Sequence, residues 1–215
     1  INRCLVGSEM CIRDSQAAST PGEDLISFLA QGEATKHMAP NEFLGNVLLL
    51  IVGGNDTTRN SITAGVQALN QFPEQYDKLK GNIDLIPNMV SEIVRWQSPV
   101  AHMCRTAMDD VEVGGKTIRK WDKVAIWYLS GNRDAAHFAD ADRLVIDRAN
   151  VRQHLSFGYG IHRCLGNRLA EMQLTILWQE IMQRFAHVEV VGEAKYLNSS
   201  FIRGITELPV RVHDR

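Results

Sequence analysis

Apolar residues return at helical spacing in several stretches of the chain. The longest of these patterns extends from about Asn41 to Leu69, where apolar side chains recur every three or four residues. Shorter patterns of the same kind predict helices over four further ranges, Glu23–Gln31, Pro73–Lys80, Leu85–Trp96 and Arg168–Arg184. The chain is therefore expected to be rich in α-helix.

The spacing becomes strand-like in the middle of the chain. Val111–Val113 and Lys116–Ile118 flank the pair Gly114-Gly115, and this arrangement predicts a two-residue hairpin. The remaining patterns predict strands over Lys123–Leu129 and Thr206–Val212 and an irregular meander over Asp140–Leu155. The expected fold class is mainly α with a small β region.

Composition narrows the possible classes of function. The chain has 215 residues, of which 45% are hydrophobic and 22% charged, as in a soluble globular unit with a sizeable core. Its 23 basic and 25 acidic side chains give a net charge of −2, and no basic run indicates a nucleic-acid partner. The apolar run Val47–Val52 is too short to span a bilayer, and no secretory leader is present, so we expect a cytoplasmic protein without a membrane span.

The densest chemical signal is the segment Phe157-Gly158-Tyr159-Gly160-Ile161-His162-Arg163-Cys164-Leu165-Gly166. Cys164 stands just before a predicted helix, whose free N–H groups and dipole stabilise a thiolate. The glycines remove side chains where a flat ligand must lie close to the backbone. Taken alone, Cys164 could be a small buried residue in an ordinary loop, but the whole segment favours a cysteine-ligated haem.

A second polar motif, Gly53-Gly54-Asn55-Asp56-Thr57-Thr58, lies inside the longest apolar helix pattern. Glycine pairs weaken a helix interior, and Asp or Thr side chains compete for its hydrogen bonds, so we expect a kink here. An acid and an alcohol at a kink can pass protons to a ligand held over it. The alternative is a kinked core helix with solvated polar residues.

These motifs resemble those of the cytochrome P-450 superfamily, the haem-thiolate monooxygenases. The resemblance implies the C-terminal half of the cytochrome P-450 fold and a haem b (iron protoporphyrin IX) cofactor with Cys164 as the axial iron ligand. It places Phe157 beside the thiolate, Gly158 and Gly166 in the haem loop, and His162 at a haem propionate.

The same resemblance assigns roles outside the haem loop. Asp56 and Thr57 take the acid and alcohol positions of the oxygen-activation motif, acting on bound O2. Arg105 takes the position of an arginine that reaches a propionate. His102 is a second propionate or cavity residue, with a satisfied core histidine as an equal alternative.

Glu92-Ile93-Val94-Arg95 places an acid and a base on one face of a predicted helix. An isolated pair of this kind is usually solvated and stabilises little. In the order of motifs found here, however, it resembles the family's Glu-x-x-Arg pair, with Arg148 as the third, basic member. We expect a buried, structural charge network without a catalytic role.

The resemblance also bears on the extent of the chain. Family members are about twice as long, and these motifs belong to their C-terminal half. Residues 1–15 match nothing in the family and are expected to be a sequencing or assembly scar. Residues 16–215 are expected to be the C-terminal part of a single cytochrome P-450 domain, too incomplete to hold haem well alone.

Further stretches, such as Ser91–Pro99, Trp127–Asp134 and Phe201–Pro209, resemble bacterial medium-chain alkane and fatty-acid terminal hydroxylases. Trp121 departs from that pattern, because it stands where a turn glycine is usual. Substrate-contacting segments of the family would include five apolar residues that plain core packing explains equally well: Val47, Ile51, Val100, Phe201 and Ile202.

The implied reaction takes electrons indirectly from NAD(P)H through a ferredoxin reductase and a ferredoxin. Arg163 and Arg168 would help dock an acidic partner of this kind, although solvated surface arginines are equally ordinary. Two alternatives stay open: a hydroxylase of terpenes or steroids on the same scaffold, and a non-catalytic haem-binding protein. The pair Asp56-Thr57 favours an enzyme, because a carrier or sensor does not need it.

Overall fold

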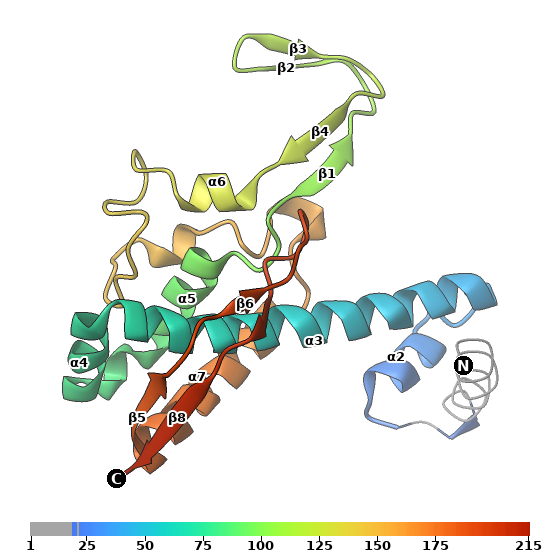
Figure 1. Cartoon of the computed structure of the whole chain (residues 1–215). Helices are drawn as coiled ribbons and strands as arrows, with labels where there is room; N and C mark the ends of the chain where they lie inside the picture. Colours follow the sequence, from blue (N-terminus) through green and yellow to red (C-terminus); the bar gives the residue numbers. More distant parts are fainter. Residues whose placement is uncertain (1–18, 21) are drawn as a thin grey trace. The chain divides into compact units, whose positions relative to one another are not determined.

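The computed structural model describes residues 19, 20 and 22–215 (Figure 1). The expectation for residues 1–15 lies outside this range. The chain divides into two compact units, one ending at Gly54 and the other comprising Asn55–Arg215, and the division falls within the long helix α3 (Pro40–Gln71). In the described part of the chain, no helix is both long and apolar enough to cross a membrane.

The first unit contains α2 (Leu25–Gln31) and the beginning of α3. Asp24 caps α2, because its Oδ1 accepts hydrogen bonds from the backbone N–H groups of Ile26 (2.9 Å) and Ser27 (3.0 Å). The Ser27 hydroxyl donates to Oδ2 of the same carboxylate at 2.8 Å. These bonds, above all those from Ser27, hold the pKa of Asp24 below its usual range.

The second unit is built around helices, as the periodicity predicts. The rest of α3 is followed by α4 (Pro73–Gly81), α5 (Ile86–Gln97), α6 (Tyr128–Asn132) and α7 (Asn167–Arg184), with short 3₁₀ turns η1 (Ile83–Leu85), η2 (Val151–Gln153) and η3 (Gly160–His162). The predictions of α2, α3, α4, α5 and α7 are confirmed, because each of these helices begins and ends within two residues of its predicted range.

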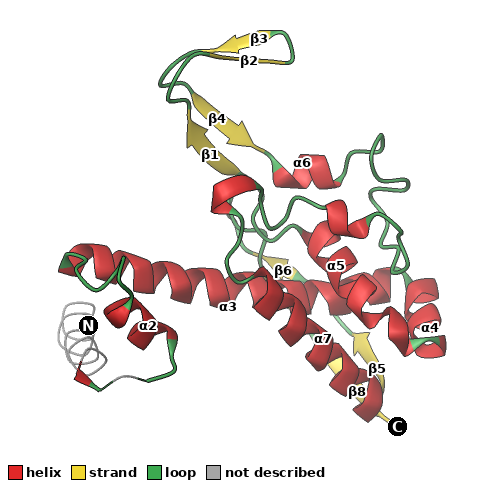
Figure 2. Cartoon of the chain, turned by 180° about the vertical axis from the view of Figure 1, so that it is seen from behind, coloured by secondary structure: helices red, strands yellow, loops and turns green. Residues whose placement is uncertain are grey.

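The core of this unit lies where α3, α5 and α7 pack together (Figure 2). A Cβ atom on Gly65 of α3 would lie 2.8 Å from the ring of Trp178 and 2.9 Å from the side chain of Ile93. Glycine therefore allows a close approach of three helices that any larger residue would prevent. The core also contains fully buried side chains from these helices, from α4 and from the meander: Leu69, Leu79, Met89, Leu144, Ile146 and Leu174.

Four two-stranded antiparallel sheets complete the unit. They pair β1 (Met103–Thr106) with β4 (Lys123–Ile126), β2 (Val111–Val113) with β3 (Lys116–Ile118), β5 (Phe185–Val190) with β8 (Val210–Asp214), and β6 (Lys195–Tyr196) with β7 (Ile205–Glu207). The predicted hairpin is confirmed, with φ of +57° at Gly114 and +73° at Gly115. Two consecutive left-handed residues are what this turn requires.

Three strand predictions need correction. The strand predicted over Lys123–Leu129 ends at Ile126, because Leu129 lies in α6 and donates its N–H to the carbonyl of Ala101 (3.2 Å). The predicted C-terminal strand is split into β7 and β8 around Pro209. The strands β1, β5 and β6 were not predicted, because the partners of β1 and β5 lie far along the sequence and β6 has only two residues.

Trp121 has φ of +73°, in the left-handed region where glycine carries no steric cost. A glycine, which the family resemblance leads us to expect at this position, would adopt this backbone conformation more easily than Trp121 does. The Lys120 ammonium lies 5.5 Å from the Trp121 ring and accounts for one contact of this otherwise exposed side chain.

Candidate functional site

Cys164 is exposed on a loop whose shape depends on glycine. Gly158 and Gly160 have φ of +69° and +73°, and a Cβ on Gly158 would lie 3.3 Å from the Tyr128 hydroxyl. The Cys164 backbone N–H donates to the Phe157 carbonyl at 2.8 Å, which closes the loop. α7 begins three residues later, so the thiol stands near a helix N-terminus, beside the exposed Arg163.

The surface around Cys164 is strongly apolar. Tyr159, Ile161 and Leu165 are 84%, 96% and 87% exposed, and Leu169 and Met172 continue the apolar surface along the exposed side of α7. Bulky apolar side chains exposed to this degree mark a surface that binds another group. His162 and Gly166 are also exposed on this loop.

His102 carries an unsatisfied polar atom. Its Nδ1 is buried and has no hydrogen-bond partner within the described residues. The ring is held by Trp127, which stacks on it at 4.5 Å, and by Phe201, whose ring meets it edge-on at 6.0 Å. A buried orphan atom of this kind costs free energy unless a ligand satisfies it.

The donor set fits a haem. An exposed thiol supplies a soft axial ligand, the left-handed glycines leave the loop backbone uncovered, and the orphan imidazole nitrogen suits a haem propionate. Arg105 lies on β1 and donates to the carbonyl of its neighbour Cys104 at 2.9 Å. Within the described residues, neither Arg105 nor His162 has an acidic partner.

Three of the predicted substrate residues come together around an isolated antiparallel bridge between Val100 and Ile202. Next to it, the Ala101 N–H donates to the Phe201 carbonyl at 2.9 Å. The other two, Val47 and Ile51, belong to the first compact unit. Val47 is buried and Ile51 is 57% exposed.

The glycine pair Gly53-Gly54 does not interrupt α3, which is helical at every residue from Pro40 to Gln71, and the kink expected there stays a prediction. A helix-interior glycine costs only about 1 kcal/mol relative to alanine, too little to open a long helix. Asp56 also does not compete for a backbone amide. Its carboxylate pairs with Arg59 one turn later at 3.0 Å, with both side chains largely exposed.

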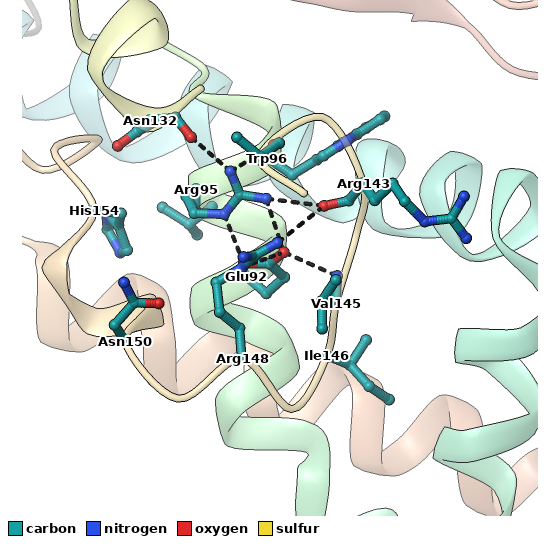
Figure 3. Close-up of polar contacts among 12 residues, drawn as sticks. Glu92, Arg95, Trp96, Asn132, Arg143, Val145, Ile146, Arg148, Asn150 and His154 are labelled. Atoms are coloured by element: carbon teal, nitrogen blue, oxygen red, sulfur yellow. Dashed lines mark hydrogen bonds and ion pairs between the residues drawn. The ribbon is translucent and has the colours of Figure 1, made fainter. Parts of the chain in front are cut away.

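Glu92, Arg95 and Arg148 form a buried network (Figure 3). Two Arg95 nitrogens donate to the two Glu92 oxygens at 2.7 and 2.8 Å, and Arg148 Nε donates to the same carboxylate at 3.1 Å. The side chains of Glu92 and Arg95 have no exposed surface, and that of Arg148 has 5%. The structure therefore brings these three predicted residues together.

The remaining donors of the network reach backbone carbonyls at the end of α6 and in the meander. Arg95 donates to the carbonyls of Asn132 (2.6 Å), Ala141 (2.8 Å) and Arg143 (3.0 Å). Glu92 also accepts the Val145 N–H at 2.9 Å. One carboxylate thus neutralises one of two buried guanidinium charges, and carbonyl dipoles stabilise the excess positive charge. The network fixes the meander against α5.

His154 lies in the chain segment between this network and the Cys164 loop, and sequence reasoning assigned it no role. Burial, together with the positive charges of Arg95, Arg163 and Arg152, lowers its pKa to about 4. Its ring lies 5.3 Å from the Phe157 ring, and its Nδ1 accepts the Ser156 N–H at 3.2 Å. At neutral pH, His154 is therefore an uncharged acceptor.

This shift predicts a pH-dependent stability. Between pH 6.5 and 4 the unfolded chain binds a proton at His154 that the folded chain does not, so stability falls by about 3 kcal/mol as the pH drops through this window. His154→Asn keeps an acceptor for Ser156 without titrating. Denaturant unfolding at several pH values should show a steeper loss in the parent than in the variant, and equal slopes would contradict the assignment.

Sequence reasoning also missed Asn132 and the two serines whose hydroxyls accept its N–H groups, Ser98 and Ser156. Their only sequence signals were the stretches that resemble the terminal hydroxylases, and these carried no role for a single one of the three residues. A polar residue at the end of a five-residue helix is ordinarily a surface residue, whereas Asn132 is fully buried.

Comparisons with known proteins show to which family the chain belongs. The Cytochrome P450 family model matches residues 9–206. The chain is 44% identical over 193 residues to linalool 8-monooxygenase from Pseudomonas putida, covering 89% of this chain and 47% of that protein. It is 42% identical over 191 residues to a methyl-branched lipid omega-hydroxylase from Mycobacterium tuberculosis, covering 87% of this chain and 44% of that protein.

Among solved structures, cytochrome P450-153 from Novosphingobium aromaticivorans superposes with a TM-score of 0.90 at 45% sequence identity, covering 97% of this chain and 52% of that one. The chain therefore spans about half the length of the relatives that it matches. The extent of the family match, and the similarity in both sequence and structure, lead to one conclusion: the chain belongs to the cytochrome P450 family.

Proposed function

We propose that the protein is a haem-thiolate monooxygenase in which Cys164 is the axial iron ligand. The observation that carries this proposal is the exposed Cys164 thiol on a glycine-shaped loop, three residues before α7 and within an apolar surface. When bound, the haem supplies the activation of O2, and a thiolate ligand favours cleavage of the O–O bond.

The protein's own residues would orient the haem and manage protons. His102, Arg105 and His162 bind the propionates, and Phe157 packs beside the thiolate, with Gly158 and Gly166 keeping the loop clear of the ring. The Thr57 hydroxyl would hold a proton for the oxygen substrate, and the Asp56 carboxyl would resupply that proton. An exposed ion pair such as Asp56–Arg59 stabilises by less than about 1 kcal/mol, so the carboxylate can leave Arg59 during turnover.

A ferredoxin, itself reduced by a ferredoxin reductase with NAD(P)H, would supply the electrons. Arg163 and Arg168 are both exposed near Cys164 in the sequence. Arg168 also lines a surface depression of about 300 Å³ together with Arg152, Glu171, Met172 and Ile176. Positive charge around an apolar floor suits an acidic partner of this kind.

We infer that the substrate is a linear aliphatic chain, an alkane or fatty acid, hydroxylated at its end. The resemblance of several stretches to terminal hydroxylases supports this, as does the relative named a methyl-branched lipid omega-hydroxylase. Val100, Phe201 and Ile202 would hold the chain end near the iron, with Val47 and Ile51 as further contacts. The relative named linalool 8-monooxygenase favours the second candidate, a hydroxylase of terpenes.

Activity measurements need a chain as long as the relatives. We define the completed enzyme as residues 16–215 of this chain joined to the part of the Novosphingobium aromaticivorans P450 that this chain does not cover. The completed enzyme retains every residue assigned a role above.

Phe201→Ala in the completed enzyme should shift hydroxylation of a linear chain from the terminal carbon toward internal positions. Internal C–H bonds are weaker, so only the shape of the pocket protects them. Gas chromatography of the products gives the ratio of terminal to internal alcohols. Phe201→Leu, which keeps apolar bulk, should shift that ratio less. An unchanged ratio in both variants, or faster turnover of ring substrates than of linear ones, would contradict the substrate assignment.

A further inference from the structure

The side chain of Asn132 is buried and has partners on both its oxygen and its nitrogen. Its Oδ1 accepts the Leu155 N–H at 2.7 Å, and its Nδ2 donates to the hydroxyls of Ser98 and Ser156, each at 2.8 Å. Asn132 ends α6 and has no exposed surface. Leu155 and Ser156 directly precede Phe157, the first residue of the Cys164 loop.

The neighbouring contacts make α6 and the loop pack closely. A Cβ on Gly131 would lie 2.7 Å from the Leu155 side chain, so α6 approaches this segment as nearly as glycine allows. The Ser156 hydroxyl in turn donates to the Val94 carbonyl of α5 at 2.7 Å. The start of the loop is therefore bonded both to α6 and to α5.

On its other side, Asn132 belongs to the buried charge network. Its backbone carbonyl faces Arg95 and accepts a hydrogen bond from Nη1 at 2.6 Å (Figure 3). Ser98, which receives one Asn132 N–H, donates its own hydroxyl to the Arg95 carbonyl at 2.9 Å. Two short paths thus lead from Arg95 through Asn132 to Leu155 and Ser156.

We propose that Asn132 is a positioning residue that couples the Glu92–Arg95–Arg148 network to the loop bearing Cys164. The proposal rests on the proposed function insofar as Cys164 is the haem ligand. A carboxamide is the one side chain of this size that accepts a hydrogen bond at one end and donates two at the other. Since all of these groups are buried, each lost bond leaves a desolvated polar atom, and the loop can move to satisfy it.

The first experiment measures the hold of Asn132 on the loop. In the haem-loaded completed enzyme, Asn132→Ala should speed amide hydrogen exchange at Leu155 and Ser156 about tenfold, while exchange in the middle of α7 stays unchanged. Asn150→Ala is the matched control, because Asn150 lies in the same meander and donates to the His137 carbonyl at 2.8 Å without a bond to the loop. Unchanged exchange in Asn132→Ala would overturn the proposal.

The second readout separates positioning from plain stabilisation. At equal haem content, Asn132→Ala should move part of the red-shifted ferrous–CO band to the unshifted position, because a mobile loop holds the thiolate on iron for less of the time. Asn132→Asp keeps the acceptor for Leu155 but not the donors, and should show a smaller loss of the band. A lower melting temperature with the whole band retained would mean that Asn132 is only structural.

Ser156→Ala keeps the test decisive if Asn132→Ala does not fold. It removes one partner of Asn132 and leaves the Leu155 bond, so it should speed exchange at Ser156 and shift a smaller part of the band. Failure of the proposed function can be told apart from failure of this proposal. If Cys164 is not the haem ligand, Cys164→Ser leaves the red-shifted band in place. The hydrogen-exchange rates of Asn132→Ala still show in that case whether Asn132 holds the loop. Unchanged exchange and an unchanged band in Ser156→Ala would overturn the coupling.

Discussion

Cys164→Ser in the completed enzyme is expected to abolish the red-shifted ferrous–CO band and to reduce turnover below detection. A serine hydroxyl does not ionise near neutral pH, so it cannot replace the anionic sulfur ligand. The exposed position of Cys164 makes a packing effect of this small substitution negligible. The measurement is the reduced-plus-CO difference spectrum at equal haem content.

Cys104→Ser is the matched control for this prediction. Cys104 is the other free cysteine of the described residues, is equally exposed, and lies on β1 beside the proposed propionate ligand Arg105. This variant should keep the red-shifted band. Retention of the band in Cys164→Ser, or its loss in Cys104→Ser alone, would contradict the assignment of Cys164 as the ligand.

Glu92→Gln is expected to destabilise the fold by about 3–5 kcal/mol, because it leaves two fully or nearly buried guanidinium groups without a counter-charge. Arg148→Met should cost less, since the neutral Glu92–Arg95 pair remains. Glu180→Gln is the surface control: it breaks the exposed Arg184–Glu180 pair and should change stability by less than about 1 kcal/mol.

Denaturant unfolding of the three variants in the completed enzyme gives these differences. The expected order of destabilisation is Glu92→Gln, then Arg148→Met, then Glu180→Gln. A loss for Glu92→Gln as small as that for Glu180→Gln would mean that the buried network contributes little to stability. A selective loss of haem without a loss of stability would instead assign the network to cofactor binding.

The helices were predictable because their evidence is local. The spacing of apolar residues, Pro73 at a helix start and Pro99 after a helix end are all read within a few residues. The hairpin at Gly114-Gly115 was predictable for the same reason. The pairing of β5 with β8 was not predictable, since its register joins residues that lie 20 to 29 positions apart in the sequence.

In the candidate site, too, the features with a local sequence signal were predictable and those that depend on distant contacts were not. The glycines of the Cys164 loop and the spacing of Glu92 and Arg95 are sequence signals, whereas the full burial of that ion pair and the contacts of Asn132 depend on the meander folding back onto α5. The glycine pair does not interrupt α3, because the cooperative hydrogen bonding of a 32-residue helix outweighs a weak local preference.

The most direct test of monooxygenase function follows the oxygen atoms. The completed enzyme, supplied with a ferredoxin, a ferredoxin reductase, NADH and a medium-chain alkane under ¹⁸O2, is predicted to form an alcohol carrying one ¹⁸O atom, as measured by mass spectrometry. The same mixture with the Cys164→Ser variant should form none. A normal haem spectrum that shifts on ligand addition, without labelled product from any aliphatic substrate, would contradict the account and favour a non-catalytic haem-binding protein.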